Sequence, residues 1–313
     1  MTVEPPSRWI DPNPPDPANP RTTAILAASG VALTILVLSA LVVVVFTAGG
    51  GESGPTQGEA VLVAANTSVA DPFTRSVLVA PVTISDQVRS KSQALLQQVP
   101  IRADRGVRLI SGRQPELYGA TGETFPCDVA TLANILDADP LKAEAWGLAL
   151  GLAPPQLPFY LNTLTPVVLT ADTWVTAHTL AGSAVEAKQA VLQSGNAVLI
   201  DPLGVPRVHC ASGVPLTPPA NTDLTQYRLN GEAWTSFSPQ HVVAVNYASA
   251  DGGAAATEFA LIDVNSGQQV VRTAGGTIDL GSAALPLPDP AVMNIPPTDI
   301  NVPEAMYTPV RKP

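Results

Sequence analysis

The sequence has few charged residues, few aromatic residues, three histidines and two cysteines. Charged residues make up 13% of the chain and apolar residues 46%, which argues against a disordered acidic protein. The chain has 16 basic residues against 26 acidic ones, so its formal net charge is −10. This balance argues against partners that are polyanions, such as nucleic acid.

Motifs of common cofactor sites and active sites are also missing. No P-loop or dinucleotide fingerprint is present, so a nucleotide site has no support. There is no Cys-x-x-Cys, and the three histidines share no ligand spacing, so no metal site is expected. The Gly-x-Ser-x-Gly turn that exposes a serine nucleophile is lacking as well. The sequence therefore predicts no cofactor and contains no complete catalytic motif.

What the chain does contain is one long uncharged apolar segment, Ala24–Phe46. A helix needs roughly 20 such residues to cross the hydrocarbon core of a bilayer. We therefore predict one transmembrane helix, with a Pro-rich head at residues 1–23 before it and a flexible linker at residues 47–59 after it. The alternative is a cleaved signal peptide, whose apolar core is typically about 7–15 residues long.

Basic residues set the expected orientation of this helix. Arg8 and Arg21 precede it, whereas the first basic residue after it is Arg75. Positively charged residues are retained in the cytoplasm. The head is therefore expected to be cytoplasmic, and the C-terminal domain extracytoplasmic, in a single-pass protein of the cell membrane.

The two cysteines, Cys127 and Cys210, are far apart in the sequence. In an oxidising compartment such a pair most simply forms one disulfide. The alternative is two buried free thiols. The expected location outside the membrane favours the disulfide.

Apolar periodicity and turn residues predict an α+β domain over residues 60–280, with a short helical block and β-hairpins. A Pro-rich, loosely ordered tail is expected over residues 281–313. Asp139-Pro140 is a typical helix start, and Asp201–Gly204 supplies the turn of a hairpin. Helices are expected over residues 85–99, from residue 127, and over residues 140–150 and 155–164; strands are expected over residues 61–64, 107–110, 166–170, 197–200, 205–208, 241–247, 259–264 and 269–272.

Several stretches carry a family resemblance: Leu117–Thr121, Cys127-Asp128, Lys142–Trp146, Leu164–Val167, Ala171–His178, Val191–Gly195, Gly204–Cys210 and Gly213–Leu216. Together they resemble an uncharacterised extracytoplasmic domain of actinobacterial single-pass membrane proteins. The resemblance covers roughly residues 61–275. It implies an architecture and a location and no particular activity.

The sequence departs from this family pattern at three positions. The resemblance leads one to expect Arg at Trp174, Asn at Ala177 and a further Cys at Ser212. The first two departures weaken the idea that this block is a polar catalytic centre. The third leaves Cys127 and Cys210 as the one pair that can form a disulfide.

Asp172 and His178 are the nearest approach to an acid–base pair. A nucleophile within about 3 Å of the base would also be required, and Ser183, Ser194 and Cys210 are the available candidates. A single Asp–His spacing is a weak motif. The favoured alternative is structural: Asp and Thr side chains fix a turn by bonding to the backbone, and His178 packs beside it.

His209 precedes Cys210 and could lower the pKa of its thiol. Neighbouring residues on a strand point to opposite faces, however, and a disulfide removes the thiol altogether.

Trp174 and Tyr118, together with the other tryptophans, could line a sugar-binding or lipid-binding cleft. Their ordinary use as core anchors is favoured.

These observations predict a membrane-anchored, non-enzymatic domain that binds an envelope protein, glycan or lipid. The alternative is an envelope hydrolase that uses Asp172 and His178.

Overall fold

The computed structural model describes residues 57–246, 255–281 and 283–288. These residues all belong to a single compact unit. The predicted head, the predicted span Ala24–Phe46, most of the predicted linker and most of the predicted tail lie outside the described residues. Within the described ranges, no helix combines the length and the apolar character that crossing a membrane requires.

The helices are short, and the predicted ones are confirmed. A local hydrogen bond explains where three of them begin: the side chains of Ser85, Asp128 and Asp139 each accept from a backbone N–H of the first turn. The described helices are α2 (Asp86–Gln97), α3 (Val129–Asp137), α4 (Pro140–Leu148) and α5 (Leu157–Thr163), with the 3-10 turns η1 (Pro154–Gln156), η2 (Leu224–Gln226) and η3 (Pro239–His241).

The strands form one extended mixed sheet, which confirms the α+β class. Each strand that the sequence predicts is present within a few residues of its expected position. The described strands are β1 (Glu59–Val63), β2 (Arg108–Ser111), β3 (Tyr118–Ala120), β4 (Thr165–Leu169), β5 (Thr173–Ala181), β6 (Ala184–Leu192), β7 (Ala197–Ile200), β8 (Pro206–His209), β9 (Val214–Thr217), β10 (Arg228–Asn230), β11 (Val243–Asn246), β12 (Glu258–Asp263) and β13 (Gln269–Thr273).

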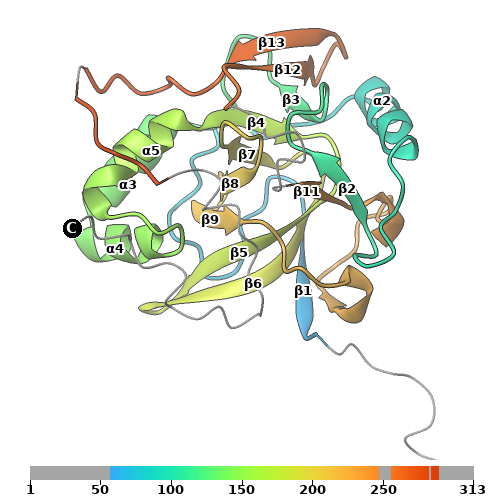
Figure 1. The fold of residues 1–313 in the computed structure, drawn as a ribbon, viewed down its shortest axis with the longest axis horizontal. Coiled ribbons are helices and arrows are strands. Elements are labelled where there is room, and N and C mark those ends of the chain that lie inside the picture. Colours follow the sequence, from blue (N-terminus) through green and yellow to red (C-terminus); the bar gives the residue numbers. More distant parts are fainter. Residues whose placement is uncertain (1–56, 247–254, 282, 289–313) are drawn as a thin grey trace, which may run out of the picture. The chain divides into compact units, whose positions relative to one another are not determined.

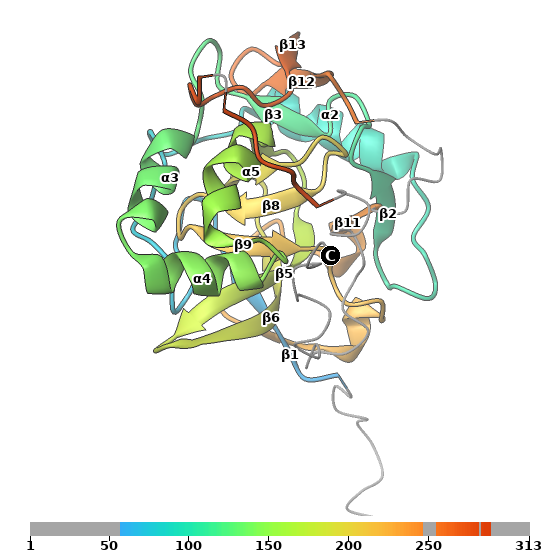
Figure 2. The same cartoon turned by 60° about the vertical axis from the view of Figure 1, so that its left-hand side comes forward.

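The order of the strands is β10-β1-β6-β5-β9-β8-β7-β4-β3-β12-β13. Along this order all neighbours from β6 to β3 are antiparallel, whereas β1 is parallel to both β6 and β10. Both views show α3, α4 and α5 grouped together, with α4 nearest the β5–β6 hairpin, while α2 lies apart from them beside β2 and β3 (Figures 1 and 2).

The sheet divides at β5. Thr173 and Trp174 at the start of this strand pair with β11, which in turn pairs with β2. Thr176 and Ala177, further along the same edge, pair with β9 instead. Because both branches use β5, this strand is central to the sheet.

The sequence did not predict strands β5 and β6, and the expected turn after Asp172 extends no further than the start of β5. Thr173 does bond to the backbone, since its hydroxyl donates to the carbonyl of Ala171 over 2.9 Å. From there the chain continues as a nine-residue strand, and after a two-residue turn it returns as β6. The β6 sequence is rich in Ala, Glu, Lys and Gln, which favour helices, so its strand conformation comes from pairing with β1 and β5.

Apolar side chains of the sheet and of α3, α4 and α5 share the largest core cluster. A second cluster surrounds Trp174, and a third lies beneath α2. Trp146 of α4 is fully buried in the first cluster, and its indole N–H donates to the carbonyl of Gly213 over 2.9 Å. This bond and the burial fix α4 against the turn between β8 and β9.

Candidate functional site

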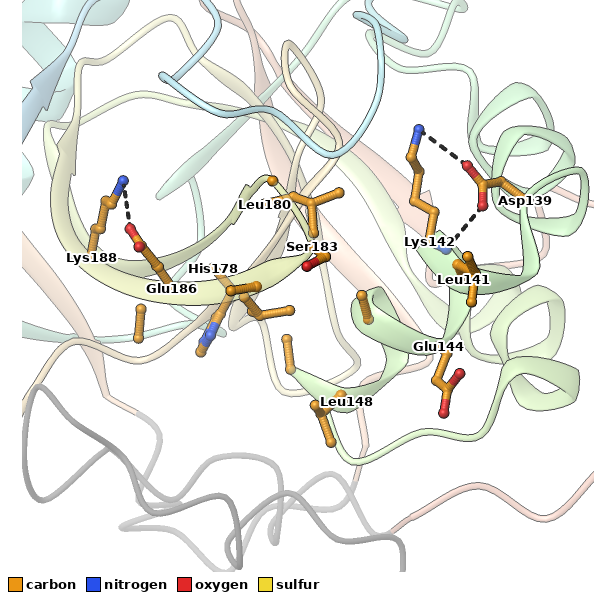
Figure 3. A pocket seen from close by; sticks show the side chains of 16 residues that line it. Asp139, Leu141, Lys142, Glu144, Leu148, His178, Leu180, Ser183, Glu186 and Lys188 are labelled. Carbon is orange, nitrogen blue, oxygen red and sulfur yellow. Dashed lines mark hydrogen bonds and ion pairs between the residues drawn. The ribbon is translucent and has the colours of Figure 1, made fainter.

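A cavity of about 1290 Å³ lies between α4 and the β5–β6 hairpin. We call it the α4–hairpin groove. Figure 3 shows Leu141 and Leu148 of α4 on one side of it and Leu180 and Ser183 of the hairpin on the other. Its walls are made by one helix and one hairpin, which are regular elements, so its lining is held in place by the fold.

One wall of the groove is the outer face of α4. The inner face buries Ala143 and Trp146. A second apolar stripe, Leu141, Ala145 and Leu148, has the i, i+4, i+7 spacing of one helical face and lines the groove. Leu141 is 80% exposed and Leu148 is 37% exposed. Ala145 between them packs partly against the core, so the two leucines are the exposed apolar side chains of this wall.

The other wall is the β5–β6 hairpin. Its two-residue turn contains Gly182, whose φ of +66° suits the turns that join two strands directly. On one face of the hairpin, Leu180 stands opposite Val185 and His178 stands opposite Ala187. These four residues all line the groove.

Charged residues form the rim of the groove. Lys142 lies 3.7 Å from the carboxylate of Asp139, and Lys188 lies 3.1 Å from that of Glu186 (Figure 3). Lys188 also lies 3.3 Å from the Asp71 carboxylate. Both basic groups of the rim are therefore neutralised.

Glu144 lies on α4, in the same rim, and is exposed. Among the described residues it takes part in no ion pair. The rim is therefore acidic on the side of α4.

His178 lies at the floor of the groove and is 3% exposed. Its Nε2 lies 2.9 Å from the hydroxyl of Thr217. Burial lowers the pKa of His178 to about 4, so its imidazole is neutral at pH 7.

Asp172 lies elsewhere. Its carboxylate accepts hydrogen bonds from the backbone N–H of Ser194 at 2.8 Å and from the indole N–H of Trp234 at 3.0 Å. Burial raises the pKa of Asp172, and these two hydrogen bonds oppose that rise. A strand advances about 3.3 Å per residue, so the Cα atoms of Asp172 and His178 lie about 20 Å apart. The structure does not bring the two predicted catalytic residues together.

Trp174 and Tyr118, the two predicted binding residues, are both buried, with 0% and 2% exposure, and neither lines the groove. Trp174 packs edge-on against Tyr227 and lies beneath the guanidinium of Arg105, 5.3 Å from the ring centroid. The hydroxyl of Tyr118 donates to the carbonyl of Gly204 over 2.5 Å.

Cys127 and Cys210 are joined by a disulfide, with Cα atoms 6.0 Å apart, as predicted. Cys210 therefore has no thiol for His209 to activate. The bond connects the segment just before α3 to the end of β8, so it fastens the helical block to the sheet.

The structure contains a buried Ser–His–Asn arrangement that no sequence motif indicates. His209 Nδ1 lies 2.8 Å from Ser212 Oγ, and its Nε2 lies 3.0 Å from Asn196 Oδ1. Because an amide oxygen only accepts, Nε2 carries the proton and Nδ1 accepts from the Ser212 hydroxyl. Burial lowers the pKa of His209 to about 4. All three side chains are 0% exposed, so this network has a structural role.

The buried ion pair between Arg207 and Asp201 was likewise not predicted from the sequence. Arg207 Nε lies 2.8 Å from the carboxylate of Asp201, and the two side chains are 0% and 2% exposed. The other oxygen of Asp201 accepts from the backbone N–H groups of Leu203 and Val205. The pair therefore orders the turn between β7 and β8. Among the described residues, no group of three or more His, Cys, Asp and Glu side chains is placed to hold a metal ion.

The fold and the groove together define a disulfide-linked α+β domain with an apolar groove beside a β-hairpin. The chain belongs to the family described as Domain of unknown function (DUF6777), whose model matches residues 108–275. The match ends where the resemblance noted from the sequence ends. It begins at Arg108, so β1 and α2 lie outside it. The chain matches no curated protein. It also matches no solved structure.

Proposed function

We propose that this chain is a membrane-anchored, extracytoplasmic binding protein of the cell envelope, and that it recognises its partner in the α4–hairpin groove. The observation that carries the proposal is the pair of exposed leucines on α4, Leu141 and Leu148, which line this groove. Pockets for small ligands usually measure about 300–1,000 Å³. A groove of about 1290 Å³ is better suited to a segment of a macromolecule.

The disulfide supports the location. Such bonds persist in oxidising compartments and are rare in the cytosol. The predicted anchor Ala24–Phe46 and the basic residues before it supply the membrane attachment and the orientation in this proposal.

The positions of the reactive side chains favour binding over hydrolysis. Asp172, just before β5, and His178, within it, are about 20 Å apart. The Ser212–His209–Asn196 network has no exposed atom through which a substrate could reach it. Neither set offers a nucleophile and a base together at the groove.

Site-specific photocrosslinking tests the binding site. We would replace Leu141 or Val271 in the full-length protein by a benzophenone amino acid and irradiate intact cells. Both side chains are well exposed, at 80% and 61%, but Val271 lies on β13, which contributes nothing to the groove lining. We expect a discrete adduct from position 141 and none from position 271, with loss of the adduct in the Leu148→Asp variant. Equal adducts at both positions would contradict the proposed site.

The compartment is tested separately by trapping thiols in intact cells with an alkylating agent before lysis. We expect Cys127 and Cys210 to resist alkylation until a reductant is added. Alkylation of both cysteines without reductant would contradict an extracytoplasmic location.

A further inference from the structure

One edge of the β5–β6 hairpin lacks a strand partner. Strand β6 pairs with β5 along its whole length. On its other side it pairs with β1, but this pairing begins at Gln189, opposite Ala60. The segment Ala184–Lys188 therefore has a free edge within the described part of the chain.

The geometry of the hairpin identifies the free backbone groups. The two-residue turn is closed by Ala181 and Ala184, which form a hydrogen-bonded pair in hairpins of this type. Hydrogen-bonded and non-hydrogen-bonded pairs then alternate along an antiparallel ladder. Val185 and Ala187 consequently direct their N–H and C=O groups away from β5. These groups amount to two donors and two acceptors, the pattern that an added strand satisfies.

The free edge and the groove coincide. Val185 and Ala187 both line the groove, and Leu141 and Leu148 of α4 line it from the opposite side. A strand added here would lie on the same side of β6 as β1, beyond the residues at which β1 pairs with β6. Its backbone would bond to β6, and the side chains on one of its faces would meet the apolar stripe of α4.

A second free edge helps to separate the contribution of the groove from that of the backbone. Strand β13 ends the sheet order, and its described pairing is with β12 alone. The N–H of Ala274 donates to the carbonyl of Thr257, so by the same alternation Val271 directs its backbone groups outward. No residue of β13 lines the groove.

Charge adds a preference to the site. The two lysines of the rim are paired with carboxylates, whereas the exposed Glu144 of α4 takes part in no ion pair among the described residues. A basic side chain on the incoming strand would complement it.

Resting on the proposed function, we infer that the groove takes an extended peptide segment of a partner protein, which adds as a strand to β6 at Ala184–Lys188. The segment carries apolar side chains at alternate positions, because successive side chains of a strand face opposite sides, and a basic residue for Glu144.

The experiment begins with a phage-displayed library of random 12-residue peptides, selected on the full-length protein in nanodiscs. The affinity of a selected peptide is then measured by fluorescence anisotropy. Val185→Pro and Ala187→Pro each remove one outward N–H and leave the β5 ladder intact, since proline is tolerated on edge strands. We expect each variant to bind about 10-fold more weakly or worse, because the ring removes a hydrogen bond and obstructs the incoming strand. Val271→Pro is the matched control on the other edge and should bind like the unaltered protein.

The peptide itself provides a readout that cannot alter the folding of the protein. Methylating its backbone nitrogens one at a time should weaken binding at every second position and leave the positions between unaffected. Glu144→Lys should weaken binding of a basic peptide by about 2- to 5-fold, as expected for an exposed ion pair.

The outcomes separate the two proposals. Normal binding by both proline variants, with binding lost in Leu141→Asp, would overturn strand addition and leave the groove as the binding site. Selected peptides that bind Leu141→Asp normally would overturn both. A dimer of the full chain that Val185→Pro dissociates would assign the edge to a second copy and overturn the peptide proposal.

Discussion

Acidification is expected to destabilise this domain through two buried histidines. His178 and His209 both have their pKa lowered by burial from 6.5 to about 4. In the unfolded chain each takes up a proton near pH 6.5, whereas in the folded domain each does so only near pH 4. Unfolding is therefore coupled to proton uptake, and the free energy of unfolding falls as the pH is lowered from 6.5 to 4.

The magnitude follows from the two shifts. One pKa unit corresponds to about 1.4 kcal/mol, so each histidine contributes about 3 kcal/mol to the loss across this window. Asp172 acts in the opposite sense, because its raised pKa means that the folded domain takes up this proton at a higher pH than the unfolded chain. Native domains have a total stability of about 5–15 kcal/mol. The loss is therefore large enough to bring the domain close to unfolding near pH 4.

Urea denaturation of the oxidised full-length protein between pH 7.5 and about pH 4 measures this loss, with the fluorescence of the buried Trp146 and Trp174 as the signal. His209→Gln should remove about half of the pH dependence, whereas His241→Gln, at an exposed position, should retain it. A free energy of unfolding that stays constant between pH 6.5 and pH 4 would refute the assignment of two neutral buried imidazoles.

Two further predictions concern the stability of the fold. The Cys127–Cys210 disulfide joins residues 83 apart in the sequence, so its reduction should lower the free energy of unfolding by about 4–5 kcal/mol. Urea denaturation with and without reductant measures this difference. A change below about 1 kcal/mol would contradict the prediction. Gly204→Ala should cost about 3 kcal/mol or more, because Gly204 has a positive φ and a Cβ there would overlap the backbone of Gly112. The control is Gly182→Ala, also at a positive φ but with open space around it, which should lower the free energy of unfolding by about 1 kcal/mol. Thermal or urea unfolding measures both variants. Equal losses in the two variants would contradict the close approach of Gly204 to Gly112.

Elements that are set by local chemistry could be predicted from the sequence. The start of α4 depends on Asp139, whose side chain accepts from the N–H of Lys142, and on the proline that follows it. The β7–β8 hairpin depends on the turn residues Asp201–Gly204. Both signals lie within a few residues, so no knowledge of the rest of the fold was needed.

The β5–β6 hairpin could not be predicted in the same way. Its turn has only two residues, Gly182 and Ser183, and the strand that follows contains residues with helical preference. Pairing with β1, which precedes β6 by more than a hundred residues, determines the strand conformation instead. The groove depends on where α4 lies against this hairpin, so it could not be read from either segment alone.

One signal of the groove was nevertheless present in the sequence. Leu141, Ala145 and Leu148 have helical spacing and form a stripe distinct from the one that contains Trp146. Ala145 in this stripe packs partly against the core, whereas Leu141 and Leu148 are left exposed at the groove. The predicted aromatic binding residues, by contrast, are buried in the core.

The position of β1 has a consequence for biosynthesis. This strand lies between β6 and β10 and is parallel to both, and Val61 is aligned with Asn230. At synthesis rates of about 5–20 residues per second, the first strand waits on the order of ten seconds before its second neighbour leaves the ribosome. During that interval one edge of β1 stays unpaired, so the sheet closes around this strand only after most of the domain has been synthesised.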